Sequence, residues 1–206
     1  MHHQRQQAKP VILIAGMTGT GKSTLARRIA QRYGLRYVSG GDALKAMAAE
    51  LGYTPGGPEW WETPEGLRFL KQRQEDPEFD RKVDRWLMRV ADEGNVVIDS
   101  WTMPWLYDGG FKIWLMASKE TRAKRIAERN GISYEEALKI MEEKDGETKR
   151  LYKRLYGFDL GEDLTPFHLI VDTENLNKDE VFQAVYTILD HYISKNRQSS
   201  LRVSST

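Results

Sequence analysis

Short, almost wholly apolar runs alternate along the chain with longer segments whose apolar residues recur at helical spacing. The apolar runs cover residues 11–15, 36–38, 96–99, 111–116 and 167–171. Their short length and continuous hydrophobicity are typical of strands that are buried on both faces of a parallel sheet. Strands that alternate with helices in this way predict a doubly wound α/β domain.

The predicted helices have recognisable ends as well as apolar stripes. Asp76 and Pro77 predict a helix start, and Gly94 predicts the end of that helix. Its stripe is Phe79, Val83, Trp86, Leu87 and Val90. Asn177 and Glu180 form a capping-box pattern that predicts the start of the last helix. The stripe of that helix is Val181, Val185, Ile188, Leu189 and Tyr192.

The first predicted strand leads directly into a glycine-rich segment of defined spacing. Gly16, Gly21, Lys22 and Ser23 match the pattern GxxxxGK[ST] of a phosphate-binding P-loop. The glycines let backbone N–H groups converge on phosphate oxygens, and the helix that follows adds the positive end of its dipole. Lys22 can reach the β- and γ-phosphates, and the Ser23 hydroxyl can ligate Mg²⁺. We therefore expect ATP and Mg²⁺ to bind here, with nucleotide contacts also from Thr18, Gly19, Thr20 and Thr24.

Other polar residues come directly after predicted strands, where ligands of α/β proteins bind. Asp99 ends the third strand and is expected to hold Mg²⁺ together with Ser23. Gly41 and Asp42 follow the second strand, where they either face an acceptor or begin an ordinary helix. Trp101 follows Asp99 and could form an aromatic wall for a planar acceptor or pack beneath a loop.

Basic residues gather on two of the predicted helices. Arg122, Arg125 and Arg129 share one face of the helix after the fourth strand. Such a face is either solvated or close enough to the phosphates to neutralise the charge that develops on a transferring phosphoryl group. Lys149 and Arg150 belong to a second basic cluster, which could equally be a surface charge run.

Composition limits the classes of function that fit the chain. The 206 residues are 40% hydrophobic and 30% charged, as expected of a single globular domain, here placed at residues 1–193 with a flexible tail at 194–206. The net charge of +1 gives no overall attraction to nucleic acid and disfavours it as a partner, and no apolar run is long enough to cross a membrane. The absence of cysteine fits a cytoplasmic protein.

Taken together, these segments resemble the archaeal-type cytidylate kinases, a branch of the P-loop nucleoside monophosphate kinase superfamily. The resemblance covers about residues 10–193 and is carried by the P-loop and by residues 38–49, 76–80, 94–98, 122–131, 134–137 and 150–159. It implies a five-stranded parallel sheet with helices on both faces. It also implies a helical acceptor-binding insertion at about 40–91 and a short lid at about 130–163.

The resemblance also implies roles for individual residues. Arg125 and Arg129 correspond to catalytic arginines that contact the donor phosphates, and Lys149 or Arg150 corresponds to the phosphate-binding arginine of the lid. The acceptor side departs from the family pattern. Lys45 replaces an arginine that holds the acceptor phosphate, and no arginine stands at residues 99–104. Arg68, Arg73 or Arg85 could substitute, and the predicted acceptor set is Gly41, Asp42, Lys45, Arg85 and Trp101.

Three functions remain open at this point. The first is phosphoryl transfer from ATP to a nucleoside monophosphate, CMP or dCMP, by a monomer or weak homodimer. The second is a kinase that phosphorylates a hydroxyl group of a small metabolite, with Asp42 as the catalytic base. The third is a nucleotide-dependent switch or an RNA-associated NTPase, which the low net charge disfavours.

Overall fold

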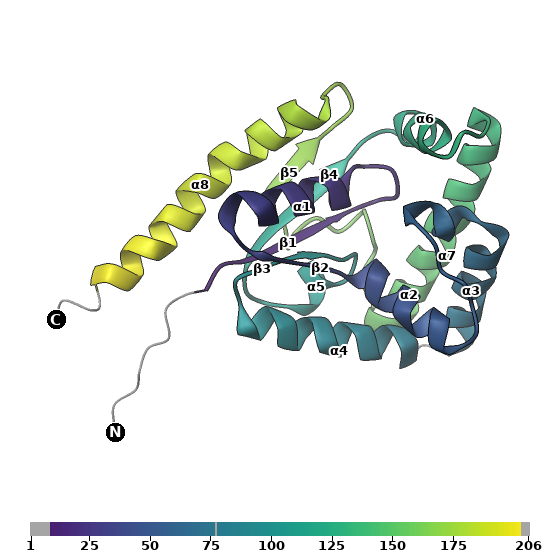
Figure 1. Ribbon diagram of the computed structural model, residues 1–206, viewed down its shortest axis with the longest axis horizontal. Coiled ribbons are helices and arrows are strands. Elements are labelled where there is room, and N and C mark those ends of the chain that lie inside the picture. The colour runs from purple at the N-terminus through teal and green to yellow at the C-terminus, as the bar shows by residue number, and fades with distance from the viewer. Residues whose placement is uncertain (1–8, 77, 203–206) are drawn as a thin grey trace.

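The computed structural model describes residues 9–76 and 78–202. Its centre is a parallel sheet with the strand order β2-β3-β1-β4-β5 (Figure 1). The strands are β1 (Val11–Gly16), β2 (Arg36–Ser39), β3 (Val96–Asp99), β4 (Phe111–Met116) and β5 (Leu169–Asp172). The expected five-stranded parallel sheet is confirmed, although β5 begins two residues later than predicted.

Helices cover both faces of this sheet because successive side chains of its strands point to opposite sides. Ile12 and Ile14 of β1 pack with α1 (Lys22–Tyr33) and α8 (Lys178–Arg202) in one buried cluster. Leu13 of the same strand belongs to a second cluster with α4 (Glu78–Glu93) and α5 (Met103–Leu106). The doubly wound arrangement predicted from the apolar pattern is therefore confirmed.

The remaining helices gather at one end of the molecule, at the right of Figure 1. They are α2 (Gly40–Glu50), the 3-10 helix η1 (Pro58–Glu62), α3 (Pro64–Glu75), α6 (Lys119–Asn130) and α7 (Tyr134–Tyr156). The predicted acceptor-binding insertion falls on α2, η1, α3 and α4, and the predicted lid falls mainly on α7. Both regions thus adjoin the end of the sheet where β1 leads into the P-loop (Figure 1).

Some details of the predicted helices differ from the structure. Trp86 and Ile188 were expected in apolar stripes, but they are 40% and 42% exposed. The buried members of the two stripes are Val83, Leu87, Val90, Val181, Val185 and Leu189. Helix α8 continues past the expected boundary at residue 193 as far as Arg202. Pro77 and residues 203–206 lie outside the described residues, so the predictions made for them stay predictions.

Within the described ranges, none of the helices has the length and apolar character needed to cross a membrane.

Candidate active site

A cavity of about 1140 Å³ lies where the P-loop meets the helical end of the molecule. The P-loop and the N-terminal end of α1 line one part of it, and residues of α2, η1, α3, α4 and α7 line the rest. Single small ligands typically occupy pockets of about 300–1,000 Å³. The cavity is therefore large enough for more than one ligand.

The P-loop requires glycine at two positions, because a side chain at either one would collide with a neighbouring part of the backbone. A Cβ atom on Gly16 would collide with the carbonyl oxygen of Leu115, so Gly16 lies beneath the loop and does not itself line the cavity. Gly19 has a φ of 84°, and a Cβ atom there would lie 2.9 Å from the carbonyl oxygen of Arg122. The loop is thus seated on β4 and α6 with no room for a side chain at either position.

Lys22, Ser23 and Asp99 meet beside this loop. The Ser23 hydroxyl donates a hydrogen bond of 2.5 Å to Asp99 Oδ2. Lys22 Nζ donates to the carbonyl oxygen of Met17 at 3.1 Å and lies 5.4 Å from the centre of the Trp101 ring. Burial in the cavity wall lowers the pKa of Lys22 to about 8 and raises the pKa of Asp99. A hydroxyl oxygen beside a carboxylate is a donor set that suits Mg²⁺.

Arg122 links the P-loop to helix α7. Its guanidinium is buried and donates to the Thr18 carbonyl oxygen at 3.0 Å and to Asp145 Oδ2 at 2.6 Å. The Thr18 hydroxyl donates to the other oxygen of Asp145 at 2.8 Å. Arg122 and Asp145 therefore position the loop and α7 relative to one another.

Arg125 and Arg129, the predicted catalytic arginines, both line the cavity. Arg125 donates to the hydroxyl and carbonyl oxygens of Thr173, which follows β5, at 2.9 and 2.5 Å. Arg129 Nη2 lies 3.1 Å from Glu62 Oε2. Their predicted contacts with donor phosphates stay predictions, and both residues lie on the side of α6 that faces the cavity.

On the acceptor side, Gly41, Asp42, Lys45 and Trp101 also line the cavity. The amino group of Lys45 donates to the carbonyl oxygens of Gly56 and Gly57 at 3.1 and 2.5 Å, so it also holds the loop before η1. Burial lowers the pKa of Lys45. Asp42 is exposed to the cavity at the start of α2.

Arg85 is not part of this site. Residues Asp80, Asp84 and Leu87 of α4 face the cavity, whereas Arg85 is exposed and lies 3.4 Å from Glu78 in an ion pair on the outer side of the helix. Of the three arginines that could have replaced the missing acceptor arginine, Arg73 lines the cavity.

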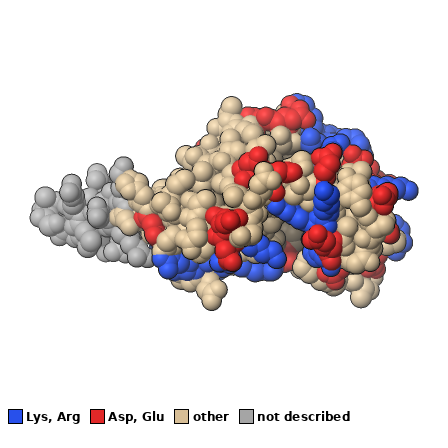
Figure 2. Space-filling model, turned by 90° about the horizontal axis from the view of Figure 1, so that it is seen from above, with Lys and Arg blue, Asp and Glu red and all other residues tan. Residues whose placement is uncertain are grey.

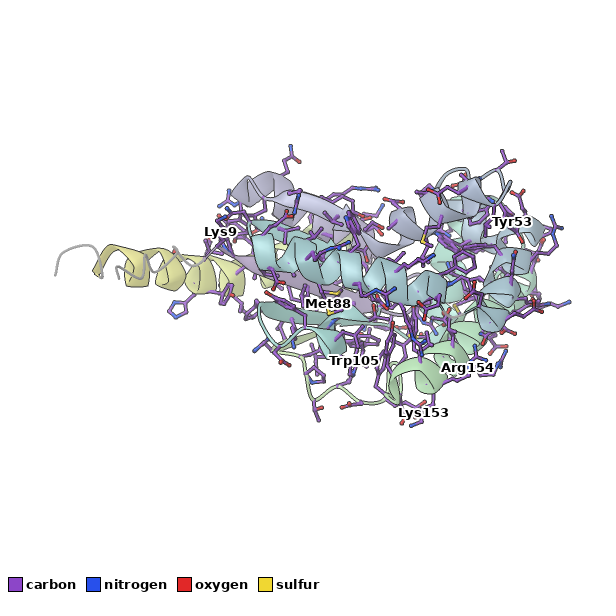
Figure 3. The ribbon with its side chains drawn as sticks, turned by 90° about the horizontal axis from the view of Figure 1, so that it is seen from below. Lys9, Tyr53, Met88, Trp105, Lys153 and Arg154 are labelled. Atoms are coloured by element: carbon purple, nitrogen blue, oxygen red, sulfur yellow. The ribbon has the colours of Figure 1, made fainter. Side chains whose placement is uncertain are left out.

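Lys149 and Arg150 are not in the cavity either. They border a separate surface pocket of about 400 Å³ and form ion pairs with Glu162 and Glu147 at 3.2 and 2.5 Å. In Figure 3, Lys153 and Arg154 of the same basic cluster lie at the outer edge of α7. The helix presents a different face to the cavity, made by Lys144, Thr148 and Tyr152. Lys149 and Arg150 point elsewhere because each residue of a helix is rotated by about 100° from the previous one.

The structure also brings two buried acidic residues into the site that the sequence did not single out, Asp80 and Asp84. Arg73 forms an ion pair with Asp80, and both side chains are almost fully buried. The carboxylate of Asp84 accepts hydrogen bonds of 2.5 Å from the hydroxyls of Thr102 and Tyr156. Burial raises the pKa of Asp84 to about 6. One signal was present, since Asp80 and Asp84 are four residues apart beside the apolar stripe of the same predicted helix.

A parallel sheet with a P-loop after β1, an acidic residue at the end of β3 and a cavity that extends well beyond the loop defines a P-loop kinase. Residues 11–175 match the model of the cytidylate kinase-like family, and the chain belongs to this family.

Relatives of known name support this assignment over most of the chain. The chain is 37% identical to a cytidylate kinase of Pyrococcus horikoshii over 184 residues, which cover 89% of this chain and 90% of that protein. It is 34% identical to a cytidylate kinase of Methanocaldococcus jannaschii over 186 residues, which cover 88% and 98%. The shikimate kinase from Bacteroides thetaiotaomicron shares the fold, with a TM-score of 0.54 at 17% identity over 89% of this chain and 99% of that chain.

Proposed function

We propose that the protein transfers the γ-phosphoryl group of ATP·Mg²⁺ to a nucleoside monophosphate, with CMP or dCMP as the acceptor. The observation that carries the proposal is the continuity of the cavity, because the P-loop and the residues of α2, α3 and α4 line the same space. Donor and acceptor can therefore meet without leaving the protein. The names of the relatives, which are cytidylate kinases, support the choice of acceptor.

The residues of the donor half fit this chemistry. The P-loop and Lys22 would hold the β- and γ-phosphates, and Ser23 with Asp99 would hold Mg²⁺, which supplies positive charge to the phosphate oxygens. Arg125 and Arg129 would neutralise charge on the phosphoryl group during transfer. The phosphate of the acceptor is already ionised at neutral pH, so the reaction needs no catalytic base.

The acceptor half has the features of a pocket for a planar base. Arg73, Asp80 and Asp84 supply hydrogen-bond donors and acceptors, and they line the cavity beside apolar side chains such as Leu70 and Val83. Apolar walls with a few fixed polar groups are typical of sites that bind small molecules. The polar groups of Arg73, Asp80 and Asp84 would orient the acceptor so that its phosphate points toward the P-loop.

A hydroxyl kinase remains the second candidate because the carboxylate of Asp42 faces the same cavity. The two functions differ in the effect of Asp42→Asn. A hydroxyl kinase would lose about 10²-fold or more in turnover number through the loss of its base, at unchanged ATP affinity. A nucleoside monophosphate kinase would lose less than about tenfold. Glu50→Gln, an exposed change on the same helix α2, is the matched control.

The direct test of the proposal is ATP consumption measured with a panel of acceptors. The panel contains CMP, dCMP, UMP, AMP and GMP, together with small hydroxy acids. We expect ADP formation that depends on CMP or dCMP and is lost in Lys22→Met. Turnover with a hydroxy acid and with none of the monophosphates would contradict the proposal, and so would ATP hydrolysis that no acceptor stimulates.

A further inference from the structure

We propose that Glu62 is a positioning residue for phosphoryl transfer, which holds the cations of Lys144 and Arg129 between the donor and acceptor halves of the cavity. The inference rests on the proposed function, because it concerns the placement of charge around the transferring phosphoryl group. Glu62 ends η1 in the predicted acceptor-binding insertion, whereas Lys144 belongs to α7 and Arg129 to α6.

The contacts of Glu62 are made by both of its carboxylate oxygens. Oε1 accepts a hydrogen bond of 2.7 Å from Lys144 Nζ, and Oε2 lies 3.1 Å from Arg129 Nη2. The Glu62 side chain is only 2% exposed and that of Lys144 is 11% exposed, whereas that of Arg129 is 41% exposed. Buried charges are held in defined places by such pairs because an unpaired charge in the interior is costly.

Glu62, Arg129 and Lys144 all line the cavity that the P-loop and α2 also line. Burial is the main cause of the lowered pKa of Lys22, and the positive charge of Lys144 lowers it further. The charge of Lys144 also contributes to the lowered pKa of Lys45, after burial. Lys144 is therefore close enough to influence both the P-loop lysine and the acceptor-side lysine. The three side chains therefore lie on the wall of the space that donor and acceptor would share.

Glu62 leaves both cations able to bind phosphate. A lysine ammonium has three N–H donors and an arginine guanidinium has five. Glu62 accepts one hydrogen bond from Lys144 and forms an ion pair with Arg129 without a hydrogen bond. Lys144 Nζ also lies 6.0 Å from the centre of the Trp61 ring, next to Glu62 in η1. The net charge of the three groups is positive, so the cluster attracts phosphate while its cations stay in place.

The alternative is that Glu62 only stabilises the packing of η1, α6 and α7 against one another. A purely structural carboxylate would affect the stability of the protein, but its loss would leave the turnover number unchanged in the protein that still folds. A positioning carboxylate predicts a separation of kcat from KM, because Glu62→Gln removes the charge that orients both cations and also removes a competitor for phosphate.

The test compares Glu62→Gln, Lys144→Met and the double variant with the wild-type protein, using ATP and the acceptor that gives turnover. Glu59→Gln, an exposed change in the same 3-10 helix, is the matched control. We expect Glu62→Gln to lower kcat by at least about fivefold with KM values unchanged or lower, while Glu59→Gln stays within about twofold. We expect the double variant to lose less than the product of the two single losses, since Glu62 acts partly through Lys144.

Two results would overturn the role of Glu62 and leave the proposed function intact. One is a wild-type protein that phosphorylates CMP beside a Glu62→Gln variant whose kcat falls by less than about fivefold. The other is a double variant whose loss equals the product of the single losses. If Glu62→Gln does not fold, it is replaced by Glu62→Asp, which keeps the charge but withdraws it by one methylene. A fall in the kcat of Glu62→Asp by at least about fivefold supports the role of Glu62, and a smaller fall overturns it. A wild-type protein with no acceptor-dependent turnover would instead overturn the proposed function, and the role of Glu62 with it.

Discussion

At the scale of single residues, the ionisation of Lys22 links nucleotide binding to pH. Burial lowers the pKa of this amine to about 8, and bound phosphates would favour its charged form. Raising the pH above 8 therefore requires the binding step to take up a proton. We predict that the affinity for ATP·Mg²⁺ falls about tenfold or more between pH 7.5 and 9.5, as measured by calorimetry. Lys22→Met should bind more weakly and show little change over this range, whereas a wild-type affinity independent of pH would contradict the prediction.

Asp84 is expected to make the stability of the protein depend on pH in the opposite sense to most carboxylates. Burial raises the pKa of Asp84 to about 6 from 3.8, despite its hydrogen bonds from Thr102 and Tyr156. Between these values the folded protein holds more protons than the unfolded chain, so the contribution of Asp84 to stability falls as the pH rises.

We predict that Asp84→Asn removes the fall in stability that the ionisation of Asp84 causes as the pH rises. The free energy of unfolding of the variant, relative to wild type, should rise by about 2 kcal/mol from pH 4 to pH 7 in urea titrations. Glu75→Gln, an exposed change on α3, should show no such trend. A constant difference between Asp84→Asn and wild type across this range would show that Asp84 titrates normally.

At the scale of elements, the contact between α7 and the P-loop depends on the buried pair of Arg122 and Asp145. Replacing Arg122 by Met leaves the carboxylate of Asp145 without its cation and removes the hydrogen bond to the Thr18 carbonyl oxygen. We predict a loss of about 3 kcal/mol in the free energy of unfolding, together with weaker ATP binding.

The matched control for Arg122 is Arg150, an exposed arginine of α7 that does not line the cavity. Arg150 of α7 also forms an ion pair, but its side chain is 64% exposed. Exposed pairs contribute little, so Arg150→Met should cost less than about 1 kcal/mol. Equal losses in the two variants would mean that the buried pair has no special role in holding α7 to the loop.

The same helix shows which parts of the site the sequence could predict. The spacing of Gly16, Lys22 and Ser23 is local, so a few neighbouring residues were enough to identify the P-loop. On α7, the sequence drew attention to a run of basic residues, but the helical face decides which of them reaches the cavity. Ala137 and Met141 are buried, and continuing their face along the helix leads to Lys144 and not to Lys149. That periodicity was a usable signal.

The role of Glu62 had no comparable signal in the sequence. It lies in a segment rich in Gly, Pro and Trp that has no helical or strand periodicity. Its partner Lys144 is 82 positions further along the chain. The pairing depends on how η1, α6 and α7 come together, and that arrangement follows from packing across the whole helical end of the molecule.

At the scale of the whole molecule, the sheet and the helical end have separate tasks. The sheet, with buried residues on both faces, holds the P-loop and Asp99 in fixed places. The helical end carries the groups that would recognise the acceptor. Figure 2 shows acidic and basic residues interspersed over the visible surface of that end, so neither sign of charge dominates it. The cavity between the two parts gives the protein one reaction space for two nucleotides.

The central claim is direct transfer between two nucleotides that occupy this cavity together. The measurement that tests it most directly is the initial rate of CDP formation over a matrix of ATP·Mg²⁺ and CMP concentrations. The account predicts equal amounts of CDP and ADP and double-reciprocal plots that intersect, because a ternary complex must form before transfer. Parallel plots would indicate a phosphorylated enzyme intermediate, and either that result or the absence of CDP would contradict the account.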